Sequence, residues 1–91
     1  MKFVIAYDIQ NSKNRKKLSD ILEGLGYRVN LSVFECEINE AKLKKLIREL
    51  TPLVNSKKDS LRFYRICETC VGKSFELCDH VDIFEAKDLF V

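Results

Sequence analysis

The 91-residue sequence predicts an α+β fold in which two helices cover one face of an antiparallel sheet. An apolar run at residues 2–8 is typical of a central strand. Two later stretches, 18–25 and 43–50, share the helical i, i+3, i+4, i+7 spacing of apolar residues. Residues 27–38 and 60–67 have extended patterns. Strand, helix, extended region, helix and strand is the order of a split β-α-β unit, so the sequence predicts a ferredoxin-like sandwich.

The first strand is apolar on both of its alternating faces and ends at Asp8. Asn11 and Ser12 then supply N-cap side chains for the first helix. This helix ends at two glycines, Gly24 and Gly26. On a helical wheel Arg15 lies about 60° from Leu18, at the edge of the apolar stripe. We therefore expect the Arg15 side chain to reach back toward the sheet.

The middle of the chain continues the same order of elements. Residues 27–38 alternate in polarity and form either one bent strand or two short paired strands. Asn39 caps the second helix, which Pro52 ends or closes soon after. The polar stretch at residues 55–59 is typical of a loop, and it leads into the strand predicted at residues 60–67.

The C-terminal tail carries a weaker signal. A short strand is predicted around residues 81–85, before the apolar end at residues 89–91. These apolar side chains are too many to leave in water on a small monomer. We therefore expect residues 80–91 to dock on a partner subunit by adding a strand to its sheet, with residues 1–91 forming a single domain.

Composition indicates an ordinary globular domain. Hydrophobic residues make up 46% and charged residues 33%, which excludes disordered and low-complexity classes. A chain of this size buries only roughly 60–65% of its unfolded surface, so we expect self-association. The opening apolar run closes at Asp8, far short of a membrane span, and it predicts neither a signal peptide nor an anchor. We therefore expect a cytoplasmic protein that does not contact a membrane.

Charge is distributed unevenly along the chain. Residues 1–65 carry 14 Lys and Arg against 8 Asp and Glu, or +6, whereas residues 66–91 carry 2 against 6, or −4. A basic body suits a polyanion such as nucleic acid, although a charged face is more often only solvated. Three lysines of the first helix point away from its apolar stripe: Lys13, Lys16 and Lys17.

Asp8 is the candidate metal ligand because it ends an apolar strand just before a basic helix. The alternatives are that Asp8 simply terminates the strand or acts as an acid at the helix start. A single carboxylate is a weak Mg²⁺ site. A metal site at Asp8 therefore requires a second acid, which a twofold dimer axis would supply.

The cysteines leave several alternatives open. Cys67-x-x-Cys70 followed by Cys78 and His80 has the residue types of a zinc site, although seven residues between Cys70 and Cys78 leave little chain for folding back. A disulfide and reduced cytosolic thiols are the other interpretations. Cys36 and Cys67, on adjacent predicted strands, also fit small core residues. His80 lies in the weak C-terminal segment and is not placed to act as a general base.

Three segments together resemble one protein family. They are Tyr7-Asp8-Ile9 with Arg15 seven residues after Asp8, the string Arg28-Val29-Asn30-Leu31-Ser32-Val33-Phe34-Glu35, and Leu61-Arg62-Phe63-Tyr64-Arg65-Ile66-Cys67. The combination is similar to the CRISPR-associated protein two family. That family is the small core component of CRISPR spacer acquisition, described as a metal-dependent endoribonuclease or DNase. The resemblance covers residues 2–70.

The resemblance implies that Asp8 binds Mg²⁺, or Mn²⁺, together with Asp8 of a second subunit. The catalytic residues that it implies are Asp8, Tyr7, Arg15, Arg28 and Phe34. Arg15 and Arg28 would stabilise phosphate charge and would bind nucleic acid together with the three lysines of the first helix. Two positions depart from the family pattern. Asn30 stands where Gln is common, and Lys17 stands where Arg is often found, which loosens phosphate binding.

We therefore expect a homodimeric CRISPR adaptation protein. It would act as a Mg²⁺-dependent endonuclease on the phosphodiesters of single-stranded RNA or double-stranded DNA and would bridge the spacer integrase complex. With no His base the site is lean for a nuclease, which leaves open a catalytically inactive scaffold that holds double-stranded DNA by its phosphates. A toxin-like mRNA endoribonuclease is a third alternative. A small-molecule regulatory domain is disfavoured because no Gly-rich ligand loop follows a strand.

Overall fold

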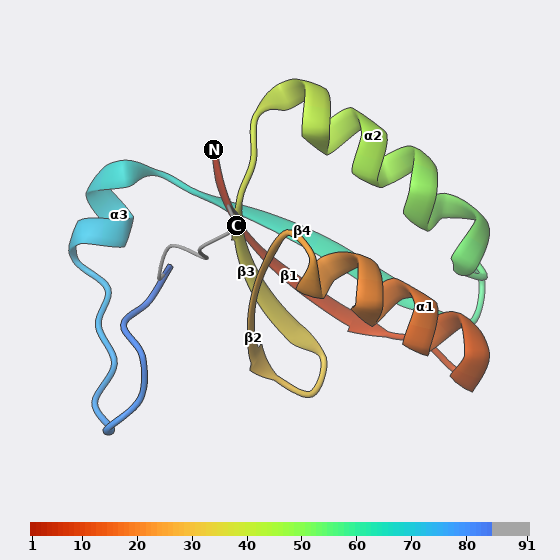
Figure 1. The fold of residues 1–91 in the computed structure, drawn as a ribbon, viewed down its shortest axis with the longest axis horizontal. Helices are drawn as coiled ribbons and strands as arrows, with labels where there is room; N and C mark the ends of the chain where they lie inside the picture. Colours follow the sequence, from red (N-terminus) through yellow and green to blue (C-terminus); the bar gives the residue numbers. More distant parts are fainter. Residues whose placement is uncertain (85–91) are drawn as a thin grey trace.

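The computed structural model of the chain describes residues 1–84 (Figure 1). In chain order, the elements are β1 (Lys2–Asp8), α1 (Ser12–Glu23), β2 (Gly26–Asn30), β3 (Val33–Glu37), α2 (Glu40–Leu50), the 3₁₀ turn η1 (Thr51–Leu53), β4 (Ser60–Ile66) and α3 (Glu68–Gly72). The four strands form one antiparallel sheet in the order β2-β3-β1-β4. This order confirms the predicted α+β, ferredoxin-like architecture.

The core lies between one face of the sheet and the two long helices. Alternate residues of the central strand β1 are buried: Phe3, Ile5 and Tyr7. Phe34 and Cys36 of β3 are buried on the same face. The helices add four buried leucines, which are Leu18, Leu22, Leu46 and Leu50. A buried leucine stabilises a fold by about 1.5–3 kcal/mol, so this single layer supplies most of the driving force.

The two long helices begin and end as their sequences predict. The side chains of Asn11 and Asn39 cap α1 and α2 by accepting hydrogen bonds from the backbone N–H groups of residues 14 and 42, at 2.9 and 2.8 Å. Gly24 is the C-cap of α1, and Pro52 lies in η1 directly after α2. Within residues 1–84, no helix is long and apolar enough to cross a membrane.

The opposite face of the sheet carries no helical layer within the described chain. Val4 pairs with Glu35 of β3 and with Tyr64 of β4, and Tyr64 is 47% exposed. The tail approaches this face at one side, where the backbone N–H of Phe84 donates a hydrogen bond of 2.6 Å to Glu35 Oε1. Although the sequence of β1 is apolar on both faces, only one of its two faces is covered by helices within residues 1–84.

Residues 27–38 form two strands and not one bent strand. β2 and β3 pair in antiparallel fashion on either side of Leu31 and Ser32, with a bulge between Arg28 and Asn30. Such a bulge strengthens the local twist and redirects the neighbouring side chains. Arg28 is thereby held at the end of the hairpin that lies beside the end of β1.

The C-terminal part differs from its prediction. Cys67 caps the short helix α3, which the sequence analysis missed, so β4 ends one residue earlier than expected. The strand predicted around residues 81–85 is wrong for its described part, because Ile83 and Phe84 form a turn in which Phe84 has a φ of +50°. A strand needs a neighbouring strand as a hydrogen-bond partner, and none of the described strands pairs with this segment. The remainder of the prediction, residues 85–91, lies outside the described residues.

Candidate functional site

The site is built at the end of the central strand. Asp8 is the last residue of β1 and lies opposite Ser60 of β4. Its side chain is exposed, and among residues 1–84 it accepts no hydrogen bond and forms no ion pair. The strand thus ends in a carboxylate that remains available to a ligand.

A depression of about 700 Å³ lies beside Asp8. Its walls come from the end of β1, the first turns of α1 and the β2–β3 hairpin, which carry the lining residues Tyr7, Asp8, Ile9, Ser12, Arg15, Lys16, Ser19, Arg28, Leu31 and Ser32. Asp8 is the one acid in this set, and the other charged side chains are three cations. The electrostatics of the depression favour an anion everywhere except at Asp8.

Arg15 connects α1 to the end of β1. Its Nη1 donates a hydrogen bond of 2.7 Å to the backbone carbonyl of Ile9, the residue after Asp8. The helical wheel predicts this return toward the sheet, and the structure confirms it. Arg15 therefore positions the turn that follows Asp8 and also places a fixed positive charge on the wall of the depression.

Arg28 is fixed by contacts on three sides. Its guanidinium carbon lies 4.9 Å from the centroid of the Phe34 ring, a cation–π distance. Nε donates to Glu23 at 2.9 Å, and Nη1 donates to the carbonyl of Leu31 at 2.9 Å. A guanidinium has five N–H donors, so further donors remain for a phosphate. The bonded donors hold the group on the wall of the depression.

Of the two aromatic residues that the resemblance assigns to the site, Phe34 lies in the core below the depression, and the largely buried Tyr7 lines it. Phe34 is fully buried, and Tyr7 is 6% exposed with its ring stacked on Phe34 at a centroid distance of 6.2 Å. The Tyr7 hydroxyl donates to the carbonyl of Leu31 at 3.1 Å, the same oxygen that Arg28 contacts. These rings support Arg28 and the hairpin from beneath. The Phe34 ring is closed to a ligand in the depression.

The three lysines of α1 are exposed, as the sequence predicts. Lys16 lines the depression but also forms an ion pair of 3.1 Å with Asp20. Within the described chain, Lys13 and Lys17 form no ion pair. Lys13 and Lys17 are therefore the lysines of α1 whose charge is least compensated.

Sequence reasoning missed Asp59, which it placed in a loop without a role. Asp59 Oδ1 accepts a hydrogen bond of 3.0 Å from the backbone N–H of Gln10, and Oδ2 accepts one of 2.8 Å from the N–H of Asn55. The bonds from Asn55 and Gln10 lower the pKa of Asp59. Asp59 thereby clamps the loop before β4 to the turn after Asp8. The sequence signal for this role is that the polar loop begins with Asn55 and ends with Asp59, because Asn and Asp side chains often bond to backbone groups in turns.

The donor set fits Mg²⁺ better than zinc. Within residues 1–84, no three His, Cys, Asp or Glu side chains are grouped to hold a metal. The possible zinc ligands Cys67, Cys70, Cys78 and His80 are therefore not assembled. Mg²⁺ needs only one or two carboxylates because it retains several waters. Among the described residues, the lining of the depression offers one carboxylate, that of Asp8.

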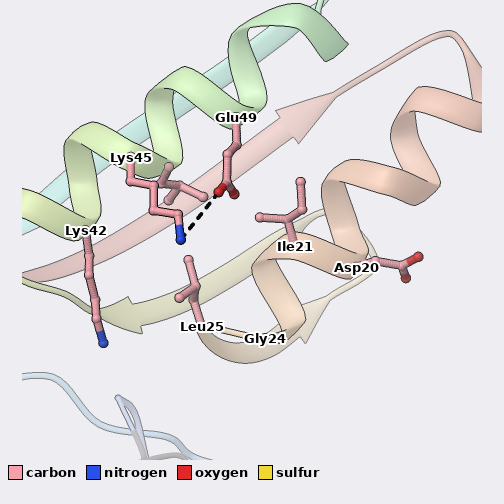
Figure 2. Close-up of a pocket in the computed structure, with 8 residues that line it drawn as sticks. Asp20, Ile21, Gly24, Leu25, Lys42, Lys45 and Glu49 are labelled. Carbon is pink, nitrogen blue, oxygen red and sulfur yellow. Dashed lines mark ion pairs between the residues drawn. The ribbon is translucent and has the colours of Figure 1, made fainter.

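A second depression, of about 350 Å³, lies between α1 and α2 (Figure 2). Ile21, Leu25 and Leu46 give it apolar walls. At its edge Lys45 pairs with Glu49 at 3.8 Å. None of the site residues predicted from the sequence lines it, so it is separate from the site at Asp8.

The chain matches the model of one protein family, CRISPR associated protein Cas2, over residues 1–74. The chain belongs to the Cas2 family. This confirms the resemblance seen in the sequence. A CRISPR-associated endoribonuclease Cas2 of Synechocystis sp. is 50% identical over 62 residues, which cover 68% of this chain and 67% of the relative.

Solved structures agree with this membership. The crystal structure of Streptococcus pyogenes Cas2 matches with a TM-score of 0.74 and 26% identity, over 86% of this chain and all of that one. A chain of a partial Cas6-RT-Cas1–Cas2 complex matches with a TM-score of 0.75 and 26% identity, over 99% of this chain and 97% of that one. The Cas2 family match ends at residue 74, so most of the tail lies beyond it.

Proposed function

We propose that this Cas2-family chain acts in CRISPR adaptation as a cytoplasmic, homodimeric endonuclease that uses Mg²⁺ or Mn²⁺ and bridges the spacer integrase. Family membership supports the adaptation role. The name of the Synechocystis relative supports nuclease activity, and the partial Cas6-RT-Cas1–Cas2 complex supports the integrase partner. The substrate is a phosphodiester of single-stranded RNA or double-stranded DNA.

The observation that carries this proposal is the exposed Asp8 carboxylate among three cations. The cations attract a phosphodiester, whereas a bare carboxylate at the same place repels it. A divalent cation on Asp8 removes that repulsion. When bound there, Mg²⁺ polarises a phosphoryl oxygen and lowers the pKa of a bound water. Asp8 and Asp8 of the partner subunit would hold it.

The chain's own residues supply the remaining stabilisation. Arg15 and Arg28 are held on the walls by hydrogen bonds to Ile9 and Leu31, so their charges need little reorganisation as negative charge develops on the phosphate. His80 does not line the depression and is not the general base. Among the described residues that line the depression there is no imidazole to act as a general base, so the proposal relies on a water that a bound metal would activate.

The exposed face of the sheet supports the homodimer in this proposal. Among residues 1–84, no helical layer covers the sheet face that carries Val4 and Tyr64, and a second copy packed there would bury that face. The tail, including residues 80–91, would strengthen this dimer by docking on the partner. A twofold axis close to the end of β1 is the arrangement that pairs the two Asp8 side chains.

Cleavage by an Asp8→Asn variant tests the proposal. Asn is nearly isosteric but uncharged, so we expect loss of metal-dependent cleavage with the fold and the dimer intact. Asp79→Asn is the matched control, because it removes one negative charge from an exposed tail residue outside the depression. Cleavage by rigorously purified Asp8→Asn protein at the wild-type rate would overturn the assignment.

A DNA-holding scaffold without catalysis is the second candidate. One carboxylate per chain is a minimal site, and Lys13 and Lys17 present uncompensated charge on the outer face of α1 within the described chain. Such charges bind a duplex through its phosphates without reading bases. If the wild-type protein supports spacer acquisition but never cleaves, the scaffold function replaces the nuclease.

A further inference from the structure

Two cysteines that the proposed function does not use lie side by side at the root of the tail. Cys67 is the N-cap of α3, and its Sγ accepts a hydrogen bond of 3.4 Å from the backbone N–H of Cys70. The same bond joins the N-cap side chain of a capping box to the backbone N–H three residues later, so the Cys67 sulfur lies against the backbone of Cys70.

The turn that holds the pair is well fixed. The carbonyl of Cys67 accepts a hydrogen bond of 2.9 Å from the N–H of Val71, and the carbonyl of Cys70 accepts one of 2.7 Å from the Ser74 hydroxyl. Glu68, between the two cysteines, forms an ion pair of 2.9 Å with Lys2 of β1. The cysteine pair is therefore both exposed and anchored to the sheet.

We propose that Cys67 and Cys70 are a redox-active dithiol, which a small-molecule disulfide oxidises reversibly to an intrachain disulfide. The Cys67 thiolate attacks one sulfur of oxidised glutathione, forms a mixed disulfide and releases one glutathione thiolate. The Cys70 thiol then loses its proton to solvent, and its sulfur attacks Cys67 Sγ and displaces the second glutathione. Two protein thiols are oxidised, and one disulfide is reduced to two glutathione thiols.

The roles of the two sulfurs follow from their hydrogen bonds. The backbone N–H of Cys70, which donates to the Cys67 sulfur, lowers the pKa of Cys67, whereas the interaction with the Cys67 sulfur raises the pKa of Cys70. Cys67 is accordingly the attacking thiol and Cys70 the resolving thiol. Burial raises the pKa of Cys36 to about 11, so that core cysteine stays unreactive in the folded protein.

Equilibration of the whole chain with mixtures of reduced and oxidised glutathione tests the proposal. After acid quenching and alkylation, peptide mass mapping identifies each disulfide. We expect an intrachain bond between residues 67 and 70 in the wild type and in Cys78→Ser, which is the control because Cys78 is also exposed. We expect Cys70→Ser to stop at a mixed glutathione disulfide on Cys67. Reduction by excess dithiol restores the starting thiols.

The rate of alkylation separates the roles without reference to nuclease activity. At pH 7 we expect Cys67 to react at least about threefold faster than Cys78. Cys67→Ser keeps a good N-cap, so the turn is preserved in that variant and Cys70 should acquire little glutathione. The proposal is overturned if the wild type forms no bond between residues 67 and 70, if that bond requires Cys78, or if Cys67 and Cys78 react equally fast.

Discussion

Arg15 Nη1 lies 2.7 Å from the backbone oxygen of Ile9, so a helix residue holds the chain one residue beyond Asp8. The bond connects the first turn of α1 to the end of the central strand. Asp59 holds the next residue, Gln10, from the opposite side through its backbone N–H at 3.0 Å. The turn after Asp8 is thus fixed by the side chain of Arg15, six residues after Ile9, and by that of Asp59, 49 residues after Gln10. The position of the Asp8 carboxylate depends on both.

Replacing Arg15 tests whether this bond positions the site. Arg15→Ala removes a hydrogen bond with a charged donor, and we expect the free energy of unfolding to fall by about 1–2 kcal/mol in urea titrations. Cleavage should fall by about tenfold or more, because the variant also lacks one of the groups that bind phosphate. Arg15→Lys keeps the charge but not the planar fork, so we expect an intermediate rate. Equal cleavage by all three proteins would contradict the assigned role.

Asp59 gives the protein a pH-dependent stability. Its pKa is lower in the folded chain than the ordinary value of 3.8, because it accepts backbone hydrogen bonds from Asn55 and Gln10. The stabilisation by ionised Asp59 is therefore fully present above the ordinary pKa of 3.8, and it is lost as the pH falls through the lower pKa of the folded protein. We expect Asp59→Asn to be less stable than the wild type at pH 7, with the difference shrinking in acid. Thermal melts between pH 7 and pH 2 measure it, and a pH-independent difference would refute this origin.

Gly26 is expected to tolerate no side chain. A Cβ there would lie 2.7 Å from Cys36 Cβ and would overlap the backbone of Glu35. Backbone atoms of hydrogen-bonded strands move little, so Gly26→Ala should destabilise the fold by about 3 kcal/mol or prevent folding. Gly72→Ala is the control, since a Cβ there has no neighbour within 4 Å. Similar melting temperatures for the two variants would show that β2 is not packed as described.

The lysines of α1 predict a salt-dependent affinity for duplex DNA. Changing Lys13, Lys16 and Lys17 together to Ala should weaken binding to all sequences alike and flatten log K against log salt. The slope should fall by about 0.9 for each phosphate that the protein no longer neutralises. Among the three single alanine variants, we expect Lys16→Ala to change this slope least, because Lys16 is already paired with Asp20. An unchanged slope in the triple variant would move the binding surface to Arg28, Arg62 and Arg65.

Sequence periodicity was enough to predict the sandwich and the position of Arg15. The spacing of Leu18 and its apolar partners defines one helix face, and Arg15 lies close enough to the edge of that face to reach back toward the sheet. Periodicity could not locate α3, because a five-residue helix shows barely one turn of the pattern. The roles of Phe34 and Asp59 depend on contacts made by tertiary structure: ring packing under Arg28, and a clamp on Gln10 from a residue 49 positions away.

The stoichiometry of bound Mn²⁺ is the most direct test of the metal site, because the proposed homodimer shares one ion between the Asp8 side chains of its two chains. Electron paramagnetic resonance of the free ion, during titration of the dimer, measures the number of ions bound. We predict one Mn²⁺ per two chains in the wild type and none at this site in Asp8→Asn. Undiminished binding by Asp8→Asn, or one ion per chain that disappears with that change, would contradict a metal shared between two Asp8 carboxylates.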